Sequence, residues 1–411
     1  PHTAEAQYDC KQRSIQRHML IPDIIHSQNK ESGIYKRNFK IDLLRGFSII
    51  FVILLHLNIR VAFNGTALGE MIPRQIYNLL FWSGIYGVEI FFTISGFLIT
   101  LTALRRYGAP GNVRPADFYK NRAARIAPLL LLLLAVLSLL DIMEVENYVV
   151  DNSSGATLGK ALLAALTFSV NWLEMKIGYL PGAWDVLWSL SVEEVFYIAF
   201  PLVCLICKRY KILFIFMLVM FLISPLFRNF WFTANEFGER NNFACMGAMA
   251  AGCMGGITAS SGRIKKNWIP YMKTAGWILF VSVMLFRSAL YQSGISKIGL
   301  NFTMLSAGTV LLLVSWWHDA SCGRNKRIKG LSFIAGMGKH SYEIYLSHMF
   351  IVLGGVSIFE SFNNSNDSNI YILYASVIIL ACIAGKLIAR FYTDPLNNCI
   401  RNIQFRKNIK A

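Results

Sequence analysis

The sequence predicts an all-α protein that crosses a membrane about ten times, with both termini in the cytoplasm. Three observations support this prediction. Hydrophobic residues make up 55% of the chain and charged residues only 15%, whereas soluble proteins carry roughly a quarter charged residues. Long apolar runs recur along the chain, and lysines and arginines gather in the short segments between them. We therefore interpret the net charge of +17 as a topology signal, not as a nucleic-acid site.

The apolar runs are long enough, with their flanks, to approach the ~20 residues that a spanning helix needs. They cover residues 41–59, 81–104, 127–140, 192–206, 213–226, 276–286, 300–317 and 370–388, and another helix carries residues 341–348. Such repetition is typical of a polytopic membrane protein.

Loop charge predicts the topology, because basic residues in short loops favour the cytoplasm. Lys36, Arg37 and Lys40 precede the first helix and place the N-terminus inside. The loop around residues 64–78 is then outside. The basic loop at residues 105–125 lies inside, and the acidic segment at residues 141–151 lies outside.

The short apolar segment at residues 161–170 decides the number of helices. If it crossed the membrane, the later basic clusters at residues 208–211, 263–266 and 324–329 and the C-terminal tail would all lie outside. We therefore predict that this segment is re-entrant or interfacial, which leaves ten spanning helices.

Three regions follow from this pattern. We expect a polar N-terminal arm at residues 1–37, a membrane domain at residues 38–395 and a basic cytoplasmic tail at residues 396–411. The arm has no apolar core followed by a cleavage site, so we expect no removable signal peptide. Cys204 and Cys207 form a Cys-x-x-Cys pair without a second pair or a nearby histidine. Packed thiols are the simpler interpretation, and we expect no metal site.

The first helix carries two polar residues at membrane depth, Arg45 and His56. They are eleven residues apart, which is about 16 Å along a helix and nearly a whole number of turns, so both lie on one face. Ionisable groups inside a membrane usually mark function. The alternatives are snorkelling for Arg45 and a structural interhelical hydrogen bond for His56.

The second helix carries Glu89, Ser95 and Gly96. Small residues allow a neighbouring helix or a ligand to approach closely, and helix packing alone is an equally good interpretation of Ser95 and Gly96. Glu89 lies near the predicted outer boundary, where it has access to water. Arg122 and Arg125, in the next basic loop, lie at i and i+3 on one side of a helical turn. Such a pair suits phosphate, although basic residues beside a membrane also attract anionic lipid.

The fourth and ninth helices contribute acidic and aromatic groups. Glu193 and Glu194 follow Ser189 and Ser191 near the start of the fourth helix, where the serines are also candidate caps. In the ninth helix, Tyr345 and His348 share a face. The topology predicts two groups across the membrane. The outer group is His56, Glu89, Glu193, Glu194 and His348, and the inner group is Arg45, Arg122 and Arg125.

Together these residues resemble the acyltransferase-3 family of membrane acyltransferases, which acylate sugars, lipopolysaccharide O-antigens, exopolysaccharides and macrolides. Five motifs occur in order between residues 38 and 395. They are Arg45 with His56, Phe-Phe-x-x-Ser-Gly-Phe-Leu at residues 91–98, Arg-x-x-Arg at Arg122 and Arg125, Trp-Ser-Leu-x-x-Glu-x-x-Phe-Tyr at residues 188–197, and Ser-Tyr-x-x-Tyr-Leu-x-His at residues 341–348.

The resemblance implies that His56 is the catalytic histidine and that Arg45, Arg122 and Arg125 hold coenzyme A. It favours Glu193 over Glu194 as the functional acid. Two departures are visible: Glu89 stands where the family commonly has Asp, and no hydrolase-like extracytoplasmic domain follows the tenth helix. We therefore expect the chain to act alone or with a separate extracytoplasmic transfer protein.

The hypothesis from sequence is transfer of an acyl group, most commonly acetyl, from an acyl-coenzyme A to a hydroxyl of a glycan or glycolipid. His56 would act as the base, aided by Glu193 and the small residues near Ser95. We expect a multi-pass protein of the bacterial inner membrane with no nucleic-acid partner. Two rival interpretations are a transporter of an anionic or lipid-linked solute, which also carries charges inside a bundle, and an inactive binding relative.

Overall fold

The computed structural model describes residues 37–152, 155–229, 236–362 and 366–400. The chain divides after Asn38, and the second unit, which begins at Phe39, contains all the helices discussed below. The expected N-terminal arm lies outside the described residues except for Arg37. Most of the expected basic tail, residues 401–411, lies outside them too.

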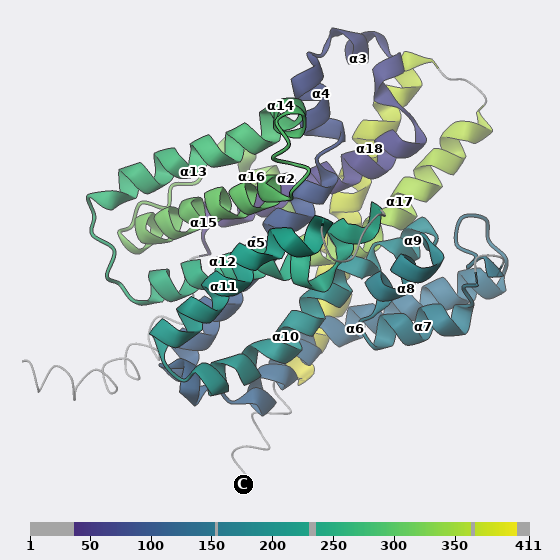
Figure 1. Ribbon diagram of the computed structural model, residues 1–411. Helices are drawn as coiled ribbons and strands as arrows, with labels where there is room; N and C mark the ends of the chain where they lie inside the picture. The colour runs from purple at the N-terminus through teal and green to yellow at the C-terminus, as the bar shows by residue number, and fades with distance from the viewer. Residues whose placement is uncertain (1–36, 153–154, 230–235, 363–365, 401–411) are drawn as a thin grey trace, which may run out of the picture. The chain divides into compact units, whose positions relative to one another are not determined.

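Within the described residues, ten helices are long and apolar enough to cross a membrane, judged by length and composition. This confirms the predicted all-α, ten-span class, and the described residues contain no strand. The orientation in the membrane stays a prediction. The ten helices (Figure 1) are α2 (Phe39–Arg60), α5 (Gly84–Tyr107), α6 (Pro115–Ile142), α10 (Leu187–Cys207), α11 (Tyr210–Asn229), α12 (Asn242–Ser260), α13 (Trp268–Leu285), α15 (Leu300–Ser321), α17 (Ser341–Ser361) and α18 (Asp367–Ile388). The last helix continues beyond α18 through a π-helical turn, so that the candidate span extends to Ile400.

Short helices connect the long ones. They are α3 (Ala67–Met71), α4 (Arg74–Phe81), α7 (Leu158–Leu166), α8 (Val170–Ile177), α9 (Gly182–Asp185), α14 (Arg287–Gln292) and α16 (Ser332–Lys339), with 3-10 turns including η4 (Glu236–Arg240).

The segment predicted not to span is indeed short. α7 has nine residues and α8 has eight, and a turn separates them. A helix of nine residues is only about 14 Å long, which is half of a hydrocarbon core. Leu163 and Leu166 of α7 are exposed, and Figure 1 shows α7 beside α6. This exposed apolar face fits an interfacial helix.

Small residues bring the central helices close together. α5 packs against α2, α12 and α15, and α12 is rich in glycine and alanine. A Cβ atom on Gly96 would lie 2.0 Å from the carbonyl oxygen of Met249, and one on Gly252 would lie 2.1 Å from that of Thr93. Only glycine allows backbones to approach this closely. Gly96 therefore serves the packing of α5 on α12, which was the alternative interpretation from sequence.

α2 and α17 run side by side in the same direction. Arg45, near the start of α2, donates hydrogen bonds to Ser341, the first residue of α17. Further along both helices, the rings of His56 and His348 lie 5.3 Å apart. We call the end where α2, α6 and α17 begin the arginine end, and the end where α2 finishes the histidine end.

The serines at the start of α10 do not cap it. The residue at the cap position is Val186, and no side chain accepts a hydrogen bond there. Ser191 instead donates to the carbonyl oxygen of Leu187 and accepts from the backbone N–H of Val170. The capping interpretation was wrong because α9 ends directly before α10, which puts both serines inside the first turns of a nearly continuous helix.

Candidate active site

A cavity of about 460 Å³ opens among α2, α5, α6, α10 and α17. Its apolar walls include Phe91, Ile94 and Leu98 of α5. The expected residues that line it are Arg45, Ser95, Arg122, Arg125, Glu193 and Tyr345. Sequence reasoning had assigned no site role to several others, namely Arg106, Asn121, Tyr197, Ser341 and Tyr342.

The arginines are held in place by neighbouring side chains. Arg45 donates from Nε and Nη2 to Ser341 Oγ, at 3.1 and 2.7 Å. The guanidinium carbon of Arg122 lies 3.5 Å from the centre of the Tyr197 ring, a cation–π contact. Arg125 is exposed and lines the same cavity. Helices α2 and α6, far apart in sequence, thus bring three guanidiniums to one hollow, where they can bind a polyanion.

Glu193 lies with Arg122 and not with the histidines. Its Oε1 accepts a hydrogen bond of 2.6 Å from Ser95 and a short one from Tyr197, and it lies 3.9 Å from Arg122 Nη2. A carboxylate that accepts from two hydroxyls and faces a guanidinium is suited to hold those groups in position. Glu194, the next residue, points elsewhere: it is buried, it does not line the cavity, and its Oε1 has no hydrogen-bond partner.

Two histidines meet beyond the cavity. The rings of His56 and His348 are 5.3 Å apart, and neither residue lines the cavity. Tyr345 connects the cavity with the histidine pair, because it lines the cavity and its ring lies 5.6 Å from that of His348. The Tyr345 hydroxyl is hydrogen-bonded to Ser189 at 2.7 Å. Tyr345 therefore stands between the cavity and the histidine pair.

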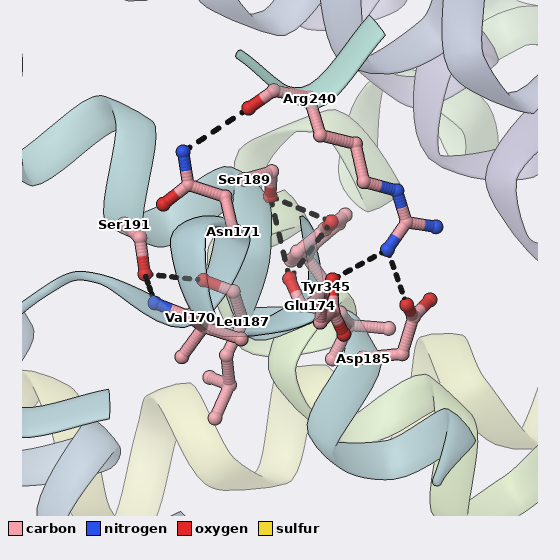
Figure 2. A network of polar contacts seen from close by, with 10 residues as sticks. Val170, Asn171, Glu174, Asp185, Leu187, Ser189, Ser191, Arg240 and Tyr345 are labelled. Atoms are coloured by element: carbon pink, nitrogen blue, oxygen red, sulfur yellow. Dashed lines mark hydrogen bonds and ion pairs between the residues drawn. The ribbon is translucent and has the colours of Figure 1, made fainter. Parts of the chain in front are cut away.

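A charged cluster at the histidine end joins the short helices to η4. Figure 2 shows Arg240 between Glu174 of α8 and Asp185 of α9, with Nη1 at 2.6 and 2.5 Å from the two carboxylates. Burial opposes the charge on Arg240, but the attraction of Asp185 and Glu174 outweighs it and raises the pKa of Arg240. Burial and the nearby charge of Asp185 raise the pKa of Glu174 to about 9, whereas the charge of Arg240 opposes this shift.

This cluster lies close to the histidine pair. Ser189 and Tyr345 are drawn next to it in Figure 2. Arg60, one turn after His56, donates to the carbonyl oxygen of His56 at 2.9 Å. The contacts of Arg240 were not predictable from the sequence, because Arg240 in η4 is 55 residues further along the chain than its partner Asp185.

Glu89 lies away from the cavity. It is buried, accepts a hydrogen bond of 2.8 Å from Arg228 and one of 2.9 Å from Ser306, and does not line the cavity. Ser95 is six positions further along α5, which turns the two side chains about 120° apart. The expected outer group of two histidines and three glutamates is therefore not assembled: His56 and His348 meet, Glu193 joins Arg122, and Glu89 joins Arg228.

The ten apolar helices of the described residues, five of which surround a charged cavity, define an integral, multi-pass membrane protein with an internal polar site. Residues 38–390 match the model of a family described as "Acyltransferase domain". The chain therefore belongs to this acyltransferase-3 family, whose members transfer acyl groups other than aminoacyl groups.

Curated relatives agree with this assignment. The chain is 24% identical over 380 residues to "Putative O-acetyltransferase SACOL0978" of Staphylococcus aureus strain COL, an alignment that covers 86% of this chain and 56% of the relative. It is 23% identical over 383 residues to "O-acetyltransferase OatA" of Staphylococcus aureus strain NCTC 8325 / PS 47, covering 87% and 56%. The chain thus spans little more than half the length of these relatives. No solved structure matches it.

Proposed function

We propose that the chain transfers an acyl group, with acetyl as the first candidate, from an acyl-coenzyme A to a hydroxyl of a glycan or glycolipid. The observation that carries the proposal is the cavity itself. It is lined by arginines and also by Tyr345, whose ring lies against that of His348. Coenzyme A thioesters have the matching polarity, with phosphates at one end and the reactive carbonyl at the other.

The donor would bind with its phosphates on Arg45, Arg122 and Arg125. Guanidiniums bind phosphate oxygens through paired hydrogen bonds and keep their charge at any accessible pH. The pantetheine arm would follow the cavity wall past Phe91 and Leu98 and bring the thioester toward Tyr345. With the arginine end in the cytoplasm, the cytoplasmic pool of thioester has direct access to it. We infer that the protein resides in a bacterial cytoplasmic membrane.

The chemistry we propose is general-base catalysis by His56. The acceptor hydroxyl gives its proton to His56 as its oxygen attacks the thioester carbonyl carbon. The carbon–sulfur bond then breaks, and the leaving thiolate takes the proton from the imidazolium. The products are an O-acyl ester and free coenzyme A. Glu193 takes no proton in this scheme, because its oxygen is engaged with Ser95, Tyr197 and Arg122.

A reconstituted assay tests the proposal. The purified chain in lipid nanodiscs would be incubated with acetyl-labelled coenzyme A and a cell-envelope glycan and glycolipid fraction from a bacterial host. We expect ester-linked label in the acceptor fraction and an equal amount of free coenzyme A. His56→Ala should abolish both, whereas Arg263→Ala, at an exposed arginine between α12 and α13, should not.

Two results would contradict the proposal. Full activity in His56→Ala would exclude His56 as the base. Movement of label across sealed vesicles without product would instead indicate transport. Because the chain covers 56% of its relatives' length, the assay should be repeated with a separate extracytoplasmic transfer protein before lack of product is taken as refutation.

A further inference from the structure

The environment of His348 contains an unusual arrangement of hydrogen-bonding atoms. His348 is fully buried. Its Nδ1 lies 2.6 Å from the carbonyl oxygen of Tyr345, and its Nε2 is buried without a hydrogen-bond partner. A buried polar atom without a partner costs about 1–3 kcal/mol, so such an atom in a fold is a candidate for a functional contact.

The carbonyl of Tyr345 determines the tautomer of His348. A carbonyl oxygen only accepts hydrogen bonds, so Nδ1 of His348 must carry the proton. In the neutral ring, Nε2 is then a bare acceptor. The tautomer thus follows from the backbone of α17 and leaves Nε2 in need of a donor.

The polar group whose ring faces His348 is His56. An imidazole nitrogen lies about 1.1 Å from its ring centre, so an N–H···N bond of about 3 Å in line with both rings separates the centres by about 5.2 Å. The observed separation is 5.3 Å, with the rings tilted by 49°. His56 is partly exposed whereas His348 is buried, so His56 is the side chain with the freedom to turn a ring nitrogen toward Nε2 of His348.

We propose that His348 is a positioning residue for the catalytic base. Its Nε2 accepts a hydrogen bond from one ring nitrogen of His56, and this leaves the other nitrogen of His56 unprotonated toward the acceptor hydroxyl. When His56 takes the hydroxyl proton, the bond to His348 stabilises the resulting imidazolium until the leaving thiolate removes that proton. The chain Tyr345 carbonyl, His348, His56 thus plays the part that an acid plays beside histidine in hydrolytic triads.

This inference rests on the proposed function for its catalytic part, but the pairing of the rings does not depend on it. ¹⁵N solid-state NMR of histidine-labelled wild-type protein in lipid bilayers tests the pairing without substrate. His348 is assigned by the signals that disappear in His348→Phe. We expect a neutral ring with Nδ1 protonated and Nε2 bare, and a shift of the Nε2 resonance in His56→Phe. Protonation at Nε2, or an Nε2 resonance that is the same in His56→Phe, would overturn the pairing.

Kinetics in the reconstituted assay test the catalytic part. His348→Phe keeps the ring volume but offers no acceptor, and we expect kcat to fall about 100-fold while KM for acetyl-coenzyme A stays within twofold. His348→Gln places a carbonyl oxygen near the position of Nε2, and we expect it to recover at least a tenth of wild-type kcat. A purely packing role predicts the opposite order, with Phe better tolerated than Gln.

The two failures are distinguishable. If the wild type forms no labelled ester, the proposed function fails, and the NMR experiment still decides the pairing. If the wild type is active and His348→Phe retains full kcat at an unchanged melting temperature, the positioning role is refuted. Thermal melting of both variants in nanodiscs reports whether they fold.

Discussion

Replacing Arg122 by alanine should weaken donor binding at the nucleotide end of the cavity. Its guanidinium is held 3.5 Å from the ring of Tyr197 and 3.9 Å from Glu193, and the side chain is about a quarter exposed. Because it is oriented before the donor arrives, little side-chain entropy is lost on binding. A hydrogen bond to a charged group contributes about 1.5–3 kcal/mol, and about 1.4 kcal/mol corresponds to a tenfold change in affinity. We therefore expect the Kd for coenzyme A to rise about 10- to 100-fold in Arg122→Ala.

The assay is equilibrium binding of coenzyme A to the protein in nanodiscs, with kinetics on two donors in parallel. Arg263→Ala serves as the control for loss of a positive charge at an exposed position. Arg122→Lys keeps the charge but not the planar fork, so it should lie between wild type and alanine. Acetyl-pantetheine lacks the nucleotide phosphates and should react equally well with wild type and Arg122→Ala.

Two results would refute this reasoning. An unchanged Kd for coenzyme A in Arg122→Ala would show that Arg122 does not contact the donor. An equal loss of rate with acetyl-pantetheine and acetyl-coenzyme A would show that Arg122 acts on the reaction or on the fold, and not through the phosphates.

Three further predictions concern stability. Gly96→Ala places a Cβ 2.0 Å from a carbonyl oxygen of α12 and should lower the free energy of unfolding by at least about 1–3 kcal/mol, which a lower melting temperature would report. The control is Gly336→Ala, whose Cβ meets no atom within 4 Å, and it should leave the melting temperature unchanged. Arg228→Met leaves the buried Glu89 without its ion-pair partner and should destabilise the folded protein by about 3–5 kcal/mol. The double variant with Glu89→Leu should recover most of that lost stability. A double variant that melts no higher than Arg228→Met would contradict the ion-pair argument. Glu174 has a pKa raised from 4.5 to about 9, so the folded state binds the extra proton and stability falls as pH rises across that window. Glu174→Gln should flatten this fall in melting temperature, and parallel curves for the two proteins would refute the assignment.

The ten spans and the short segment near residue 161 were predictable because both follow from local sequence. A spanning helix must satisfy its backbone hydrogen bonds internally, so length and hydropathy suffice to identify it. The contacts of Arg45 with Ser341 and of His56 with His348 were not predictable, because they depend on how α2 and α17 are aligned. The motif positions predict which residues act in the site, but not which of them meet.

The acidic residues show most clearly which contacts the sequence could not predict. Glu89, Glu193 and Glu194 all looked alike in sequence, as carboxylates at similar depth in apolar helices. In the structure Glu89 pairs with Arg228 and Glu193 accepts hydrogen bonds beside Arg122, whereas Glu194 is buried outside the cavity lining and its Oε1 has no hydrogen-bond partner. Depth along a helix follows from residue number, whereas the neighbour that a side chain meets depends on the rotation and packing of the other helices.

The sequence by itself determined a ten-helix membrane protein of the acyltransferase-3 family and the residue types available to its site. Only the tertiary structure decided that four arginines line one cavity, that Tyr345 lines it and contacts His348, and that Glu193 lies beside Arg122 and not beside a histidine. The reason is physical. Whether a segment spans the membrane depends on the hydropathy of its own residues. The site, in contrast, is made by side chains from five helices, whose alignment is set by close packing at small residues such as Gly96.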